Sequence, residues 1–141
     1  MIEPTLWAKL HGAATHFPIA LALVSALCEA VAWQCWSEEL RRKWRFAGTL
    51  TIVLAALGGQ VAAWSGLFAA RWRFWGHGTL LRHHQFVWPA LALITALAIW
   101  RVRQRTEPTR LGEGIYVGLI FLAALLVGGA GYWGGEMLQA G

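Results

Sequence analysis

The chain has 141 residues, of which 57% are hydrophobic and only 13% are charged, and it contains ten tryptophans. Soluble domains carry about 25% charged residues, so this composition excludes an ordinary soluble enzyme or binding module. The formal net charge of +5 belongs to cations in short connections between apolar stretches. It therefore indicates the orientation of a membrane protein and predicts no nucleic-acid binding.

Four apolar stretches follow one another along the chain, at residues 18–36, 46–70, 80–101 and 115–137. Each has close to the roughly 20 residues that a helix needs to cross the hydrocarbon layer. The alternation typical of barrel strands is absent. We therefore predict an all-α fold, in which a single membrane domain over residues 1–141 forms an integral four-helix bundle.

The first stretch opens with HGAATHFPIAL, which places His11 and His16 just before Pro18. Proline suits the first helical position and disfavours helical dihedral angles in the residue before it. We therefore expect the first helix to begin at Pro18, with His16 on a break in front of it. The positive end of the helix dipole would favour a neutral imidazole at His16, which is the form that binds metal or haem iron.

The twelve Lys and Arg residues divide four to eight between the two sides of the predicted bundle. One side holds Lys9, Arg71, Arg73 and Arg82, and the other holds Arg41, Arg42, Lys43, Arg45, Arg101, Arg103, Arg105 and Arg110. Cytoplasmic loops carry an excess of cations, so we expect the side with eight to face the cytoplasm. Both termini and the middle loop then face outward from the bacterial inner membrane.

All five histidines fall on the side of the termini and the middle loop, whichever way the chain inserts. They are His11, His16, His77, His83 and His84. Core-filling histidines would not be expected to sort to one side, so this distribution favours one site or two neighbouring sites. The alternative is that these histidines are solvated by water and headgroups at the interface and bind nothing.

The two halves of the chain repeat a pattern. GGQVAAWSG at residues 58–66 and GGAGYWGG at residues 128–135 lie near the same end of the second and fourth spans. The offset between them is 69 to 70 residues, and His16 and His84 are 68 residues apart. We predict two parallel hairpins in which His16 faces His84 and the glycines border a flat ligand. The alternative is that these small residues serve close helix packing alone.

The runs LHGAATHFPIAL at residues 10–21 and GYWGGEML at residues 131–138 resemble the DUF2231 family of small four-helix bacterial membrane proteins. The family pattern is LHPxxxHFPIAL near the start and GxxGGxLVY near the end, so the chain departs from it at Gly12. It also lacks the histidine that often follows the second motif in relatives. The resemblance implies partnership with respiratory and periplasmic redox proteins, and hence a part in electron transfer.

The first functional hypothesis is a b-type cytochrome subunit, which would be an electron-transfer subunit rather than an independent enzyme. His16 and His84 would hold haem b between the first and third helices, near the outer face. His11 and His77 are alternative ligands, propionate partners or ligands of a second haem, and His83 is the alternative to its neighbour His84. Arg71, Arg73 and Arg82 could neutralise the propionates. The expected partners are other subunits of a redox complex or a periplasmic cytochrome.

Two further hypotheses stay open. The chain could be a non-catalytic scaffold or anchor subunit of a larger redox complex, which packs through its Ala and Gly faces. It could also hold zinc or copper on four imidazoles, although such sites usually include Cys or a carboxylate. The ligands would then be His11, His16, His77 and either His83 or His84.

Glu29 is the only carboxylate well inside a predicted span. An acid at this depth is a functional candidate, here for a proton relay or a quinone contact, with Ser25 and Gln60 as partners. The alternative is that Glu29 reaches the inner interface near Arg42 or pairs with another subunit.

Overall fold

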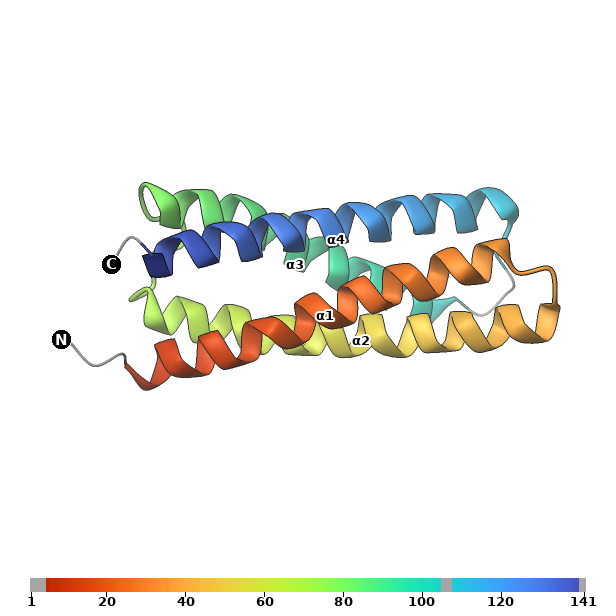
Figure 1. Ribbon diagram of the computed structural model, residues 1–141, viewed down its shortest axis with the longest axis horizontal. Coiled ribbons are helices and arrows are strands. Elements are labelled where there is room, and N and C mark those ends of the chain that lie inside the picture. The colour runs from red at the N-terminus through yellow and green to blue at the C-terminus, as the bar shows by residue number, and fades with distance from the viewer. Residues whose placement is uncertain (1–4, 105–107, 140–141) are drawn as a thin grey trace.

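Four helices lie side by side in the computed structural model, which describes residues 5–104 and 108–139 (Figure 1). They are α1 (Leu6–Gln34), α2 (Glu38–Ala69), α3 (Thr79–Arg103) and α4 (Arg110–Gln139). Each is long and apolar enough to cross a membrane, and the described residues contain no strand. The predicted all-α membrane bundle is therefore confirmed.

The helices form a ring of two hairpins. α1 packs most extensively on α2, and α3 packs most extensively on α4, while smaller α1–α4 and α2–α3 contacts close the ring. α1 and α3 run in the same direction (Figure 1). The start of α1, the end of α4 and the α2–α3 turn consequently share one end of the bundle, and the turns within the two hairpins share the other.

Local signals in the sequence set the ends of the helices. The Ser37 side chain accepts a hydrogen bond from the backbone N–H of Leu40, and Glu38 and Glu39 occupy the positive first turn of α2. Both features stabilise a helix N-terminus. At the other end of α2, Arg71 and Trp72 both adopt positive φ angles, of 52° and 63°. The chain therefore leaves α2 through a tight turn that leads back to α3.

Small side chains fill the core, and large ones face outward. The buried positions are dominated by alanine with a few β-branched residues and leucines, for example Ala22, Ala55 and Ala123. Large apolar side chains such as Leu27, Leu57 and Leu125 are more than half exposed. This arrangement is typical of helices that pack closely in lipid, where apolar side chains need no shelter from water.

Buried positions in the first hairpin correspond to buried positions in the second. The spacing in residue number between corresponding positions is constant within each pair of helices but differs between the two pairs. Buried α1 residues correspond to buried α3 residues 72 positions later, and buried α2 residues correspond to buried α4 residues 68 positions later. The pairs include Ala22 with Ile94, Ala26 with Ala98, Ile52 with Ile120, Ala55 with Ala123 and Ala62 with Ala130. The two spacings differ by four residues because the chain between corresponding positions, at the end where the two helices of a hairpin are connected, is about one helical turn longer in the first hairpin.

The predicted start of the first helix is wrong. α1 begins at Leu6 and continues without interruption through Pro18, so His16 lies on a regular helix and not on a break. Thr5 caps this earlier start by accepting a hydrogen bond from the backbone N–H of Ala8. A single internal proline removes only one helical hydrogen bond, which the surrounding helices tolerate in a membrane bundle.

The other predicted spans lie inside longer helices. α2 begins eight residues before the predicted residue 46, and α4 begins five residues before the predicted residue 115. These extra turns carry charged side chains beyond the apolar spans, which is why hydropathy alone did not include them.

Candidate functional site

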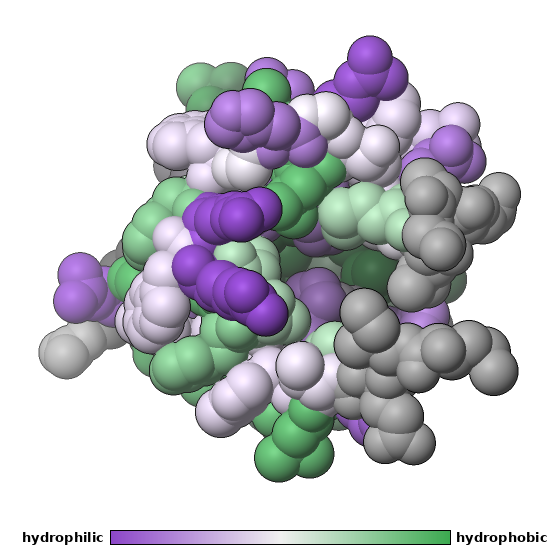
Figure 2. Space-filling view, turned by 90° about the vertical axis from the view of Figure 1, so that its left-hand side faces the viewer, coloured by the Kyte–Doolittle hydropathy of each residue, from purple (hydrophilic) through white to green (hydrophobic). Residues whose placement is uncertain are grey.

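The end of the bundle that holds the termini contains a cavity. Figure 2 shows this end, where hydrophilic and hydrophobic residues surround a central hollow. The hollow has a volume of about 220 Å³ and is lined by three imidazoles from α1 and α3 together with small and apolar side chains of α2. The three imidazoles are His11, His83 and His84. The structure therefore gathers three of the five candidate histidines around one space.

His11 is held by two residues of α2. Its Nδ1 lies 2.8 Å from the backbone oxygen of Ala62. One turn further along α2, the ring lies so close to Gly66 that a Cβ there would stand 2.8 Å from Cε1. Because a carbonyl oxygen only accepts, Nδ1 must carry the hydrogen, and Nε2 of the neutral ring keeps its lone pair.

His83 is held in the same way by α4. Its Nδ1 donates to the backbone oxygen of Ala130 at 2.8 Å, and a Cβ at Gly134 would lie 3.5 Å from its Cε1. The side chain is buried, with 8% of its surface exposed. Nε2 of His83 is therefore also the nitrogen with a free lone pair.

The two imidazoles occupy equivalent positions and face each other across the bundle. His83 follows His11 by 72 residues (83 − 11), which is the α1–α3 offset of the buried core. Their ring centroids are 6.4 Å apart, and the ring planes are almost perpendicular, at 89°. Donation of the second ring N–H to a backbone carbonyl is usual for metal-binding histidines.

His84 completes the polar lining of the cavity. Its ring centroid is 5.7 Å from that of His83 and 5.7 Å from that of Trp88, and only 6% of the residue is exposed. Nδ1 of His84 is buried and has no hydrogen-bond partner among the described residues. The ring also interacts with the backbone of Phe74 and Trp75 in the α2–α3 turn.

The predicted pairing of His16 with His84 does not match the structure. His16 is exposed on α1 and does not line the cavity, and His77 is exposed in the α2–α3 turn. The error came from applying a single offset of 68 residues to all helices, whereas α1 and α3 correspond at 72. His11 and His83, which the sequence had suggested as alternatives, are the facing pair.

The three predicted propionate partners lie at the cavity end of the bundle. Arg71 and Arg73 are exposed in the turn after α2, and Arg82 is exposed on the first turn of α3. The Arg82 guanidinium lies 4.7 Å above the ring of Trp133. The cavity end of the bundle therefore carries these three positive charges on its surface.

The zinc or copper alternative lacks its ligand set. Among the described residues, no group of three or more His, Cys, Asp or Glu side chains could hold a metal ion together. His16 and His77 are exposed and separate from the cavity, and His83 and His84 are adjacent on one helix. Among the described residues, the remaining candidates for ligands are the two imidazoles of His11 and His83.

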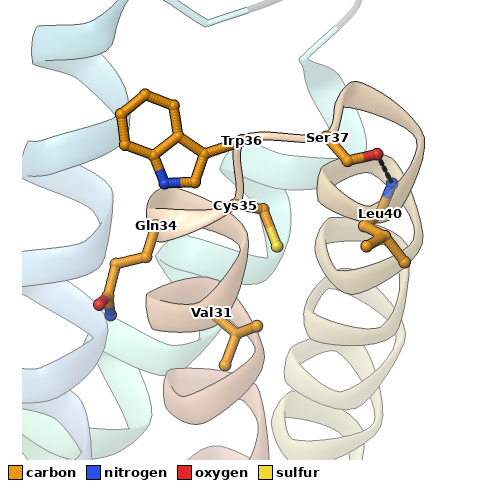
Figure 3. A pocket seen from close by; sticks show the side chains of 6 residues that line it. All are labelled: Val31, Gln34, Cys35, Trp36, Ser37 and Leu40. Atoms are coloured by element: carbon orange, nitrogen blue, oxygen red, sulfur yellow. Dashed lines mark hydrogen bonds between the residues drawn. The ribbon is translucent and has the colours of Figure 1, made fainter.

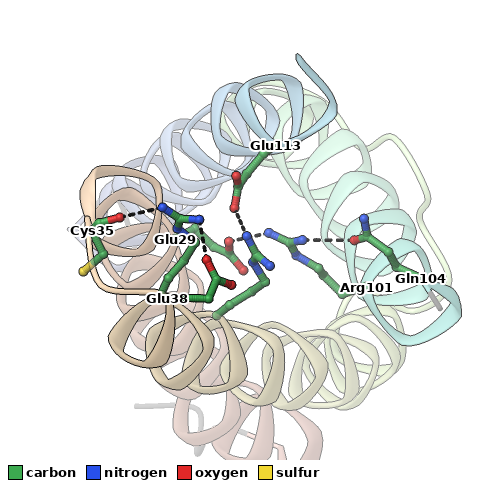
Figure 4. Close-up of polar contacts among 8 residues, drawn as sticks. Glu29, Cys35, Glu38, Arg101, Gln104 and Glu113 are labelled. Atoms are coloured by element: carbon green, nitrogen blue, oxygen red, sulfur yellow. Dashed lines mark hydrogen bonds and ion pairs between the residues drawn. The ribbon is translucent and has the colours of Figure 1, made fainter. Parts of the chain in front are cut away.

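Glu29 lies at the opposite end of the bundle. It forms an ion pair with Arg101 of α3, and Arg45 of α2 pairs with Glu113 of α4 (Figure 4). The predicted partners are engaged elsewhere, because Ser25 donates to the backbone oxygen of Gly48 and Gln60 donates to Thr95. Arg101 was not among the predicted partners of Glu29, because it lies 72 residues further along the chain on a helix whose register the sequence does not give.

A second hollow lies beside the α1–α2 turn. It is lined by Val31, Gln34, Cys35, Trp36, Ser37 and Leu40 (Figure 3). Ser37 already caps α2, and the lining contains no acid, base or second thiol that could act with Cys35. This hollow offers no paired chemical groups, so the histidine cavity is the better candidate site.

Comparison with known proteins supports the membrane assignment. A family model described as a predicted membrane protein (DUF2231) matches residues 8–140, which include every residue of the histidine cavity. No match is found among curated proteins or among solved structures.

Proposed function

The chain belongs to the DUF2231 family of predicted membrane proteins, and we propose that it is a b-type cytochrome subunit whose haem is held by His11 and His83. The observation that carries this proposal is that each hairpin contributes one imidazole held by the same kind of hydrogen bond. Each of the two rings donates Nδ1–H to a backbone carbonyl at 2.8 Å, and the rings stand 6.4 Å apart.

Two opposed nitrogens suit haem iron better than a free metal ion. A structural zinc takes four protein ligands and a catalytic zinc usually takes three. Haem iron brings four porphyrin nitrogens of its own and needs only two axial ligands from the protein. When bound between two histidines, haem supplies one-electron transfer and leaves no open position for oxygen chemistry.

Other residues at this end of the bundle would contact the edge of the haem. His84 lines the cavity, and Arg71, Arg73 and Arg82 lie at the same end of the bundle, where their positive charge would suit propionates. The volume of about 220 Å³ is below the roughly 300–1,000 Å³ of typical small-molecule sites. Haem is larger than a typical small-molecule ligand, so its binding requires the lining of the cavity to move outward.

The position of the site defines the range of partners. All the histidines lie at one end of the bundle, so a haem there serves one face of the membrane and cannot by itself carry electrons across it. We propose that the subunit works in the bacterial inner membrane with other redox subunits or a periplasmic cytochrome, and that quinol in the bilayer is the electron donor. Glu29 is not part of this proposal, because it is ion-paired with Arg101 at the other end.

The test is the haem content of matched histidine variants, expressed with haem supplied and purified in detergent. His11→Ala and His83→Ala should each abolish the reduced-minus-oxidised b-haem spectrum, because each removes one axial ligand. His16→Ala, on the same helix as His11 but exposed, should retain the full spectrum. Full spectra in both His11→Ala and His83→Ala would contradict the assignment.

A scaffold subunit remains the second candidate function, and one observation favours it. Each of the two imidazoles already joins two helices through its hydrogen bond to a carbonyl, and this stabilises the hairpins without any cofactor. In that case, His11→Ala and His83→Ala would lower the stability of the bundle, and neither the wild type nor any variant would show a haem spectrum.

A further inference from the structure

Four charged side chains are buried at the end of the bundle opposite the histidine cavity. Glu29 pairs with Arg101, and Arg45 pairs with Glu113, in the centre of the ring of helices (Figure 4). The exposed fractions of these side chains are 0% and 3% in the first pair and 14% and 9% in the second. Burying charges costs free energy that a well-packed apolar core avoids, so ion pairs at this depth call for an explanation.

Each ion pair joins two copies of the same position in the repeat. Arg101 follows Glu29 by 72 residues, which is the offset between His11 and His83. Glu113 follows Arg45 by 68 residues, which is the offset between Ala62 and Ala130. Both pairs therefore cross the approximate two-fold axis that relates the hairpins.

The two hairpins carry opposite signs at these positions. The first hairpin has an acid on α1 and a base on α2, Glu29 and Arg45. The second hairpin has a base on α3 and an acid on α4, Arg101 and Glu113. If one hairpin packed against a copy of itself in the same arrangement, carboxylate would face carboxylate and guanidinium would face guanidinium. Like charges at close range in a low-dielectric interior repel strongly.

The apolar part of the interface makes this distinction only in part. Ile52 corresponds to Ile120, Ala55 to Ala123 and Ala26 to Ala98, whereas Ala22 corresponds to the larger Ile94. Helices in lipid associate through packing and polar contacts without a hydrophobic driving force. The charged cluster therefore adds a difference in sign to the difference in size between the two hairpins.

We infer that the cluster of Glu29, Arg45, Arg101 and Glu113 selects the partner of each hairpin. It pairs the first hairpin with the second and rejects a second copy of the same hairpin. Buried polar groups specify the partner and the register of coiled coils in a comparable way. A slip of one helical turn, about 5.4 Å, would separate both pairs, so the cluster also holds His11 level with His83. This inference is independent of haem binding.

Contacts around the pairs hold the charged groups in place. The Arg101 guanidinium lies 3.8 Å above the ring of Tyr116 and donates a second hydrogen bond to Gln104 at 3.0 Å. Gly48 faces the Glu29 carboxylate so closely that a Cβ there would lie 2.8 Å from Oε1. These contacts hold the Glu29 carboxylate and the Arg101 guanidinium in the positions in which they pair across the two hairpins.

The first test uses an apolar version of the cluster in the full chain. The variant carries Glu29→Leu, Arg45→Met, Arg101→Met and Glu113→Leu. Replacement of buried ion pairs by apolar residues often preserves stability, so the variant should fold. Without the repulsion between identical hairpins, its dimer fraction in detergent should rise at least about tenfold over the wild type, measured by light scattering at matched protein concentration.

The matched control removes the exposed ion pair at the start of α2, with Glu39→Leu and Lys43→Met. This variant should keep the wild-type dimer fraction, because both residues lie on one helix. A folded apolar variant with a wild-type dimer fraction would overturn the inference.

A second pair of variants covers the case in which the apolar variant does not fold. The half-exchanged variant, Arg101→Glu with Glu113→Arg, makes like charges face each other and should lose folded monomer. Addition of Glu29→Arg and Arg45→Glu exchanges all four signs, and it should restore monomer by re-creating opposite charges in each pair. Equal monomer yields from the half-exchanged and fully exchanged chains would overturn the inference.

Discussion

At the scale of single residues, each imidazole is held by a backbone carbonyl with a glycine four residues later on the same helix face. Ala62 and Gly66 contact His11, and Ala130 and Gly134 contact His83. Only Gly66 is needed for room, because a Cβ at Gly134 would meet His83 at an ordinary contact distance of 3.5 Å. The carbonyl contact is repeated in both hairpins, whereas the close approach to glycine occurs in the first.

Replacement of Gly66 by alanine should dislodge His11. The new Cβ would stand 2.8 Å from Cε1 and 2.9 Å from Nδ1 of the ring, so the imidazole must move and lose its bond to Ala62. Overpacking and the lost hydrogen bond together should cost about 1–3 kcal/mol. Unfolding by SDS titration in mixed micelles measures this cost, and haem retention reports the loss of the ligand.

Gly135→Ala is the control for that substitution, because a Cβ at Gly135 meets nothing within 4 Å. It should leave both the unfolding free energy and haem retention at wild-type values. Equal behaviour of the two variants would show that Gly66 makes no special room for His11.

The sequence alone predicted the histidines of the site but not their pairing. His11, His83 and His84 were all candidates because five histidines sort to one end of the chain's four spans. The ligand pair could not be chosen, because a four-residue difference in hairpin length changes the offset between α1 and α3. The roles of the Ala62 and Ala130 carbonyls depend on distances between helices, which a sequence does not give.

At the scale of the helices, close approach rather than burial of large side chains holds the hairpins together. α3 and α4 meet where Phe86 lies against Gly129, so closely that a Cβ at Gly129 would stand 2.5 Å from Cδ1 of the ring. The adjacent Gly128 has nothing within 4 Å of such a Cβ. Two neighbouring glycines of one motif therefore have different roles.

Gly129→Ala should destabilise the second hairpin by about 1–3 kcal/mol, because the Phe86 ring must leave its place or the helices must separate. Gly128→Ala should be close to neutral, since its side chain would point into open space at the bundle surface. SDS titration of both variants provides the comparison. A cost at Gly128 equal to that at Gly129 would contradict the packing described for α3 and α4.

The number and order of the helices could be predicted from hydropathy, but their starts could not. Hydropathy locates the membrane-crossing segments, whereas capping by Thr5 and Ser37 extends α1 and α2 into polar sequence. The break expected at Pro18 is absent because the neighbouring helices support α1 on either side of the proline. Local rules for proline were outweighed by packing in the bundle.

At the scale of the whole molecule, charge distribution predicts the orientation in the membrane. Cys35 lies at the end with the larger number of cations, and it is partly exposed in the turn between α1 and α2, whereas Cys28 is buried. In a Cys28→Ala chain, a membrane-impermeant maleimide should therefore label Cys35 only after the membrane of spheroplasts is broken.

The matched control for orientation places a single cysteine at the opposite end, as His77→Cys in a chain without Cys28 and Cys35. This thiol should react in intact spheroplasts, since His77 is exposed in the α2–α3 turn. The reverse labelling pattern would place the histidine cavity on the cytoplasmic side, where a periplasmic partner could not reach it.

The central claim is that His11 and His83 form a haem site, and the visible spectrum of the wild-type protein tests it most directly. Protein expressed with haem supplied and purified in detergent should show sharp α and Soret bands of low-spin b haem in its reduced-minus-oxidised spectrum. A pyridine haemochrome assay should give one haem per chain, because the facing histidines form one ligand pair. A featureless spectrum under these conditions would contradict the haem assignment and leave the histidines with a structural role.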